Sequence, residues 1–144
     1  MQPSDDAILA AVAGFRRAID LAGQAPWKAK CIEFPRGACG HACGLLAYHL
    51  HNQFGIMSDL VCQDAEVEIG GWQGGHAWLE FNGLTIDISG DQFGWEGVIV
   101  TRAPMFHGRG IDQNRGPALA DMTWWRRECS ILWNAIRPFL SKPT

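Results

Sequence analysis

Apolar and polar residues alternate along residues 76–88, and this pattern predicts a β-hairpin. The predicted turn is Asn82-Gly83, because both residues accept the positive φ angles of a type I′ turn. With these two residues as the loop, one face of the hairpin carries only apolar residues, namely Ala77, Leu79, Phe81, Leu84, Ile86 and Ile88. The other face carries His76, Trp78, Glu80, Thr85 and Asp87. A slip of one residue would expose the apolar face to water, so the pattern also predicts the register.

The predicted register brings a histidine close to a carboxylate. Trp78 lies opposite Asp87, which makes His76 the diagonal neighbour of Asp87 on the same face. Diagonal pairs in an antiparallel sheet lie roughly 7–8 Å apart at the backbone, within reach of an imidazole and a carboxylate. The hairpin therefore supplies a histidine and an acid to orient it, and thiol catalysis would need only a nucleophile in addition.

Helical spacing of apolar residues occurs in three segments, residues 4–21, 39–54 and 121–140. The first has Ser4 as its N-cap and Gly23 as its stop, and its apolar stripe consists of Ile8, Val12, Phe15 and Ile19. In the last segment the residues expected in the core are Trp124, Leu132, Ile136 and Phe139, whereas Trp125 and Trp133 fall off the stripe.

The helix predicted over residues 39–54 carries two cysteines. Cys39 lies in the first turn, where unsatisfied N–H groups and the positive end of the helix dipole favour a thiolate. Cys43 lies one turn further and shares the apolar stripe with Leu46 and Leu50, so we expect it to act as a small buried hydrophobic residue.

The remaining segments are expected to be short strands and loops. The strands cover residues 56–62, 67–69 and 97–101. Loops are expected at residues 24–37, at the glycine-rich residues 70–75, which form a flap beside His76, and at residues 104–117, where His107 is a surface histidine without a partner.

Composition narrows the classes of function. The chain has 144 residues, 47% of them hydrophobic and 19% charged, which fits one folded domain spanning residues 1–144. A net charge of −3 without a basic run argues against nucleic-acid binding, and the apolar runs are too short for a membrane span. We find no secretory signal, and the odd count of five cysteines favours reduced thiols in the cytoplasm, although a domain delivered into another cell would look the same.

Three residues supply the parts of a thiol active site. Cys39 is the candidate nucleophile, His76 the base and Asp87 the group that orients the base. The backbone N–H of Cys39 at the helix start can serve as one oxyanion donor. The residues able to act as the second donor are Trp27, Gln73 and Gln92, and no spacing selects among them.

A family resemblance rests on these residues. The run RGACGHACGLL at residues 36–46, a strand entry at Gly55-Ile56, the strand sequence HAWLE at residues 76–80 and then Asp87 resemble the core of transglutaminase-like and papain-like cysteine enzymes. The order Cys–His–Asp matches, and the similar part covers about residues 35–93. The resemblance implies an α+β fold in which a helix-borne cysteine packs against an antiparallel sheet that carries the histidine and the acid.

The resemblance also implies a reaction. The thiol would attack an amide or thioester carbonyl of a protein or peptide, without a cofactor, and form an acyl-enzyme. Water would then give proteolysis or deamidation, and an amine would give transamidation. Small single-domain members of this superfamily are often peptide-processing hydrolases or effector and toxin domains, so a cysteine hydrolase or amidotransferase acting on peptide or glutamine side-chain amides is the prediction.

Alternatives remain open within this reading. A papain-like register would make Cys43 the nucleophile and Cys39 its helper. Asp91 competes with Asp87 as the orienting acid, although it lies beyond the predicted end of the strand.

Other classes of protein share parts of the pattern. A structural zinc site would draw on Cys39, His41, Cys43, His49 and His51, but only residues three or four apart converge on a helix and no second pair has finger-like spacing, so no metal is predicted. A catalytically inactive binding module on the same fold would use an aromatic surface of Trp72, Trp95, Trp124 and Trp125. An acyltransferase of the arylamine type would need a much longer chain.

Overall fold

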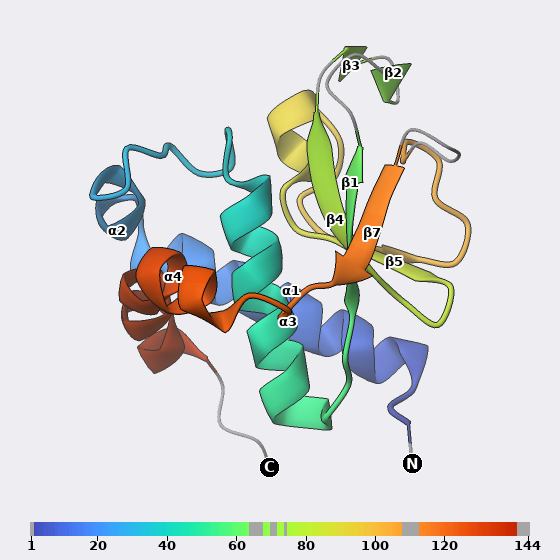
Figure 1. Ribbon diagram of the computed structural model, residues 1–144, viewed down its shortest axis with the longest axis horizontal. Coiled ribbons are helices and arrows are strands. Elements are labelled where there is room, and N and C mark those ends of the chain that lie inside the picture. The colour runs from blue at the N-terminus through green and yellow to red at the C-terminus, as the bar shows by residue number, and fades with distance from the viewer. Residues whose placement is uncertain (1, 64–67, 70–71, 74, 108–112, 141–144) are drawn as a thin grey trace.

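A computed structural model describes residues 2–63, 68–69, 72–73, 75–107 and 113–140 (Figure 1). Its helices are α1 (Asp5–Ala22), α2 (Ala25–Lys28), α3 (Cys39–Phe54) and α4 (Met122–Ile136), with 3₁₀ turns η1 (Gly90–Phe93) and η2 (Arg137–Phe139). Its strands are β1 (Asp59–Gln63), β2 (Glu68–Ile69), β3 (Trp72–Gln73), β4 (His76–Phe81), β5 (Leu84–Asp87), β6 (Ile99–Thr101) and β7 (Gln113–Pro117). The fold is therefore α+β, as predicted.

Five of the strands form one antiparallel sheet in the order β6-β5-β4-β1-β7, and β2 pairs with β3 separately. Helix α3 lies between this sheet and the other helices (Figure 1). It contacts β4 on one side and both α1 and α4 on the other. Most of the buried apolar side chains of the described residues form one cluster that includes those of α3.

Helix α1 forms where the apolar stripe predicts it. The Ser4 hydroxyl accepts a hydrogen bond of 3.0 Å from the Ala7 N–H, which satisfies one of the free donors at the helix start. The predicted stripe is fully buried, with exposures of 2% or less for Ile8, Val12, Phe15 and Ile19. Gly23, with φ of 78°, ends the helix.

Helix α3 also matches its prediction. It begins at Cys39 and ends at Phe54, and Gly55 follows in the left-handed conformation with φ of 71°. Because the backbone N–H groups of the first turn have no partner within the helix, the cysteine at position 39 stands beside free donors.

The hairpin has the predicted register. Leu79 pairs with Ile86 and Phe81 with Leu84. The turn residues Asn82 and Gly83 have φ angles of 49° and 80°, as a type I′ turn requires. The register therefore places His76 at the start of β4 and Asp87 at the end of β5.

The prediction of a loop over residues 104–117 is wrong at its second half. Residues Gln113–Pro117 form the edge strand β7, which pairs with β1 from Gln63↔Gln113 to Asp59↔Pro117. Strand pairing satisfies the hydrogen bonds of the backbone whatever the side chains are. A polar segment with Gly and Pro can therefore form the edge strand of a sheet. Strand β1 itself begins at Asp59 and β6 at Ile99, each later than predicted.

Helix α4 buries Leu132 and Ile136 as predicted, but the tryptophan that it buries is Trp125 and not Trp124. Trp125 is only 5% exposed, and its indole N–H donates to the Gly44 carbonyl oxygen at 2.9 Å. Gly44 permits this close approach, because a Cβ there would lie 3.3 Å from the Trp124 ring. Phe139, expected in the core, is 46% exposed, since the helix ends at Ile136 before a proline.

Candidate active site

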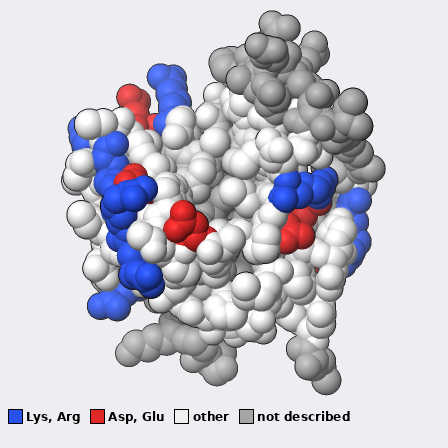
Figure 2. Space-filling model, in the orientation of Figure 1, with Lys and Arg blue, Asp and Glu red and all other residues white. Residues whose placement is uncertain are grey.

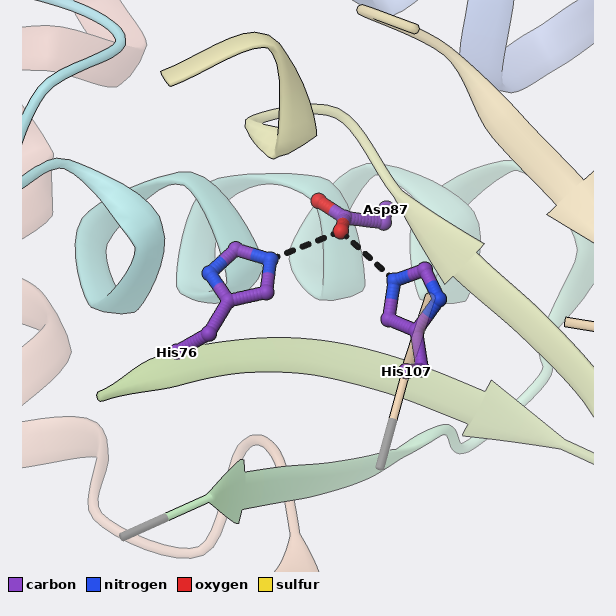
Figure 3. Close-up of side chains that lie close together, drawn as sticks. All are labelled: His76, Asp87 and His107. Carbon is purple, nitrogen blue, oxygen red and sulfur yellow. Dashed lines mark hydrogen bonds and ion pairs between the residues drawn. The ribbon is translucent and has the colours of Figure 1, made fainter. Parts of the chain in front are cut away.

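Three elements bring the predicted site residues together. Cys39 is the first residue of α3, His76 the first of β4 and Asp87 the last of β5. His76 Nε2 lies 2.7 Å from Asp87 Oδ2, and the His76 ring is near enough to the Cys39 thiol to lower its pKa. The structure thus joins all three predicted residues in one chain, and Figure 3 shows the histidine–aspartate part of it.

The Cys39 thiol lies in an environment that favours the thiolate. Burial alone would raise its pKa, but the hydrogen bond and positive charge of His76 and the backbone N–H groups of Ala77 and Gly40 lower it, and the net pKa is below that of an ordinary thiol. The free donors of the α3 start and of β4 therefore stabilise the negative sulfur from two sides.

His76 is held by its Nε2 atom, which lies 2.7 Å from Asp87 Oδ2. Its side chain is buried, and burial opposes the imidazolium. Hydrogen bonds and charges of Asp87 and Cys39 outweigh burial and raise the pKa of His76 to about 9. Since Nε2–H is committed to Asp87, the nitrogen left to exchange a proton with Cys39 is Nδ1.

Asp87 is almost completely buried and is surrounded by donors. Its Oδ1 accepts hydrogen bonds from the Ser89 N–H at 2.9 Å and the Ser89 hydroxyl at 3.4 Å. Its Oδ2 accepts from His76 and, at 2.8 Å, from His107 Nε2. Burial raises the pKa of the carboxyl, but the hydrogen bonds from His107 and His76 lower it by more than burial raises it. The pKa therefore lies well below its usual range.

The prediction that His107 is a surface histidine without a partner is wrong. Its side chain is 2% exposed and donates to Asp87. Its ring packs against Trp78, with centroids 4.8 Å apart, and Trp95, with centroids 5.3 Å apart. No signal in the sequence identified this residue, because the contact depends on how the segment after β6 folds back over the sheet.

Gln92 is the residue of the three oxyanion candidates that reaches the described site. Its Oε1 accepts from the Gly37 N–H at 3.3 Å, and its Nε2 lies 3.4 Å from His76 Nδ1. The Trp27 ring is fully buried in the core, so it is not placed to bind a substrate carbonyl. The side chain of Gln73 lies outside the described residues. The loop predicted over residues 70–75 is wrong at residues 72–73, whose backbone forms strand β3 and pairs with β2.

The environments of Cys43 and Asp91 do not suit the alternative roles of nucleophile and orienting acid. Cys43 is 5% exposed, and burial, together with the negative charges of Cys39 and Asp87, raises the pKa of its thiol well above the ordinary value. Asp91 is engaged elsewhere, since its Oδ2 lies 2.7 Å from Arg16 Nη2.

The residues considered for zinc turn to different neighbours. His41 Nε2 lies 3.2 Å from Glu128, and the His49 ring stacks on Phe15 with centroids 4.9 Å apart. Each partner is on another element, so the two rings do not converge with the cysteines.

Among the described residues, the group that could hold a metal ion is His76, Asp87 and His107, whose ligand atoms lie within 4.8 Å of one another. Tetrahedral zinc, with bonds of about 2.0–2.1 Å, separates its ligand atoms by about 3.4 Å. The separations here are 2.7 and 2.8 Å, the distances of hydrogen bonds. The arrangement therefore fits a carboxylate between two N–H donors.

The aromatic residues considered for a binding surface are dispersed. Trp125 lies in the core, and Trp95 packs beside His76 with ring centroids 5.6 Å apart. Trp124 contacts His41, and the Trp72 side chain lies outside the described residues.

Comparisons with known proteins do not extend this picture: no family model matches the chain, and neither curated proteins nor solved structures gave a significant match. No described helix is both long and apolar enough to cross a bilayer.

Proposed function

We propose that this protein is a cysteine-dependent hydrolase or amidotransferase that acts on amides of peptides or glutamine side chains through an acyl-thioenzyme. The observation that carries the proposal is the hydrogen-bonded chain from Cys39 through His76 to Asp87. Nucleophile, base and orienting acid stand in the order that thiol catalysis requires.

The proposed reaction has two halves. His76 Nδ1 takes the proton of Cys39, and the thiolate sulfur bonds to the amide carbon while the carbonyl π electrons move to oxygen. When the tetrahedral intermediate collapses, the C–N bond breaks and the amine leaves with the proton from His76. Water or a second amine, deprotonated by His76, then displaces the sulfur, which gives hydrolysis or transamidation.

Two donors are available for the developing oxyanion. The Cys39 N–H stands at the start of α3, where helix geometry gives it no intrahelical acceptor. Gln92 supplies a side-chain amide that the Gly37 N–H fixes from the other side. In the proposal these two groups bind the substrate oxygen.

The arrangement also supports a transglutaminase-like or papain-like core. Helix α3 packs against β4 of an antiparallel sheet, and the histidine and acid lie on the neighbouring strands β4 and β5. Such an arrangement is compatible with acyl transfer at a carbonyl, and it does not by itself select protease, deamidase or transamidase.

One face of the molecule has few charged side chains at its centre. Lys, Arg, Asp and Glu side chains gather at the two sides of the face seen in Figure 2, and the surface between them is mostly uncharged.

The test is the pH dependence of iodoacetamide alkylation at each cysteine, read by peptide mass spectrometry. We expect Cys39 to react well below the pH of about 8.5 at which a free thiol ionises. The exposed Cys31 serves as the internal reference. In His76→Ala the reactivity of Cys39 should fall to that of Cys31 or below.

A matched control is His51→Ala, which removes an exposed histidine from the end of the same helix. It should leave the Cys39 profile unchanged. If wild-type Cys39 reacts no faster than Cys31 at pH 6, the proposed thiolate–imidazolium pair does not exist and the function proposed here is wrong.

A further inference from the structure

The part of the site that the mechanism above does not use is His107. We propose that His107 is a positioning residue, which holds the Asp87 carboxylate in place by donating its Nε2–H to the same oxygen that orients His76. This inference rests on the proposed function, because it concerns how the base of that site is supported.

The geometry places Asp87 between two imidazole rings. Its Oδ2 lies 2.7 Å from His76 Nε2 and 2.8 Å from His107 Nε2. Figure 3 shows the rings on opposite sides of the carboxylate, His76 from β4 and His107 from the segment after β6. An ionised carboxylate is only an acceptor, so both nitrogens carry the protons in these bonds.

Burial makes the second donor matter. The side chains of His76, Asp87 and His107 are exposed by 0%, 1% and 2%. Water cannot easily replace a donor lost from such a place, and a buried charge that lacks a partner is strongly unfavourable. Without His107, the described donor left to Asp87 Oδ2 is His76, so the carboxylate is held less firmly and the hydrogen bond that orients His76 is weakened.

The position of His107 is itself fixed. Trp78 meets its ring edge-on at 4.8 Å and Trp95 at 5.3 Å. The His107 Nδ1 atom has no hydrogen-bond partner among the described residues, so a neutral ring with its proton on Nε2 accounts for the observed bond. The aromatic contacts therefore orient a single N–H toward Asp87.

A purely structural role for the ring is the competing explanation, and two substitutions separate it from the proposed role. His107→Phe keeps a ring between Trp78 and Trp95 but has no donor. His107→Gln loses the ring but places an amide N–H near the position of Nε2. The two explanations predict opposite rankings of these variants.

The measurement is the alkylation rate of Cys39 by iodoacetamide at pH 6, divided by that of the exposed Cys31 in the same molecule. We expect His107→Phe to lower this ratio about tenfold, in line with the loss of an outer hydrogen-bond partner of a functional histidine. His107→Gln should stay within about twofold of wild type. The reverse ranking would overturn the proposal and assign His107 to packing.

The Asp87→Asn background tests whether His107 acts through the carboxylate. If it does, His107→Phe should have no further effect on the ratio in that background. An equal loss in both backgrounds would show that His107 acts by another route. Should His107→Phe fail to fold, the ¹⁵N spectrum of the wild-type histidines decides, because the proposal requires the His107 proton on Nε2, and a proton on Nδ1 alone would overturn it.

Failure of this inference is distinguishable from failure of the proposed function. A wild-type Cys39 that His76→Ala does not affect refutes the thiolate–imidazolium pair itself. The other case is that wild-type Cys39 reacts fast, that His76→Ala slows its alkylation and that His107→Phe does not. This result refutes only the role of His107.

Discussion

Cys39 and Cys43 lie one turn apart on α3, and their thiols have opposite properties. Both are penalised by burial, which disfavours the charged form. Cys39 gains a hydrogen bond and a positive charge from His76 together with backbone donors, so its pKa falls. For Cys43, burial together with the negative charges of Cys39, Asp87 and Cys62 raises the pKa well above the ordinary value. The same residue type on the same helix face is thus a candidate nucleophile or a core residue, depending on what its sulfur meets.

The largest expected effect separates these two cysteines directly. Cys39→Ala should abolish turnover of a glutamine-containing peptide, by about a thousandfold or more, because Cys39 is the thiol that interacts with His76. Cys43→Ala should keep turnover within a few-fold, although loss of a buried sulfur lowers the free energy of unfolding by about 1 kcal/mol. Released ammonia and peptide fragments, read by mass spectrometry, provide the measurement.

If Cys39→Ala retains activity and the added change Cys43→Ala removes it, the assignment of the nucleophile is reversed. It would make Cys43 the nucleophile, in the papain-like register.

The second prediction concerns Gln92, the proposed side-chain donor to the oxyanion. Gln92→Ala should lower kcat on such a peptide about a hundredfold, the typical loss for one oxyanion donor. Gln92→Glu, of nearly the same shape, should be no better, because a carboxylate repels the oxyanion. The alkylation rate of Cys39 should change far less, since alkylation forms no oxyanion. Equal losses in turnover and alkylation would instead make Gln92 a residue that positions His76.

The third prediction uses Asp87, whose charge supports His76 and raises the pKa of Cys43. The carboxyl pKa is lowered in the folded state from about 3.9 in the unfolded chain. Its charge therefore stabilises the fold above about pH 4, and this contribution is lost as the pH falls below that value. We expect urea unfolding of wild type to lose about 2 kcal/mol more than Asp87→Asn between pH 5 and pH 2.5.

Parallel stability curves for the two proteins would contradict this expectation. Such curves would mean that the buried carboxyl keeps its ordinary pKa.

The smallest effect is on His76 itself. Its imidazole should titrate near pH 9 by NMR, because Asp87 and the Cys39 thiolate favour the charged ring. In Cys39→Ala the midpoint should fall by about one unit, since one of these two partners is lost. In Cys43→Ala it should remain near 9. A midpoint that does not respond to Cys39→Ala would show that the two side chains do not share a proton.

Local pattern accounts for much of the site. The hairpin register follows from period-2 alternation around Asn82-Gly83, and it places His76 and Asp87 on one face. The start of α3 at Cys39 follows from apolar spacing and the stop at Gly55. These features depend on residues within a few positions of one another, so a single sequence suffices to predict them.

Other features depend on long-range contacts. Strand β7 exists because β1 offers it an unpaired edge, and the polar residues of β7 carry no alternating pattern. Trp125 is buried because Gly44 lets α4 approach α3 closely. Neither partner is near in sequence, and helical spacing alone assigned the wrong tryptophan to the core.

The sequence by itself therefore determined the helix with Cys39 at its start, the hairpin with its histidine and acid, and the face on which these two lie. Only the tertiary structure decided that Cys39 meets His76, that Gln92 reaches the same ring and that His107 covers Asp87. The physical reason is that propensity, capping and alternation act over a few residues, whereas the donors around a buried carboxylate are brought there by the packing of the whole chain.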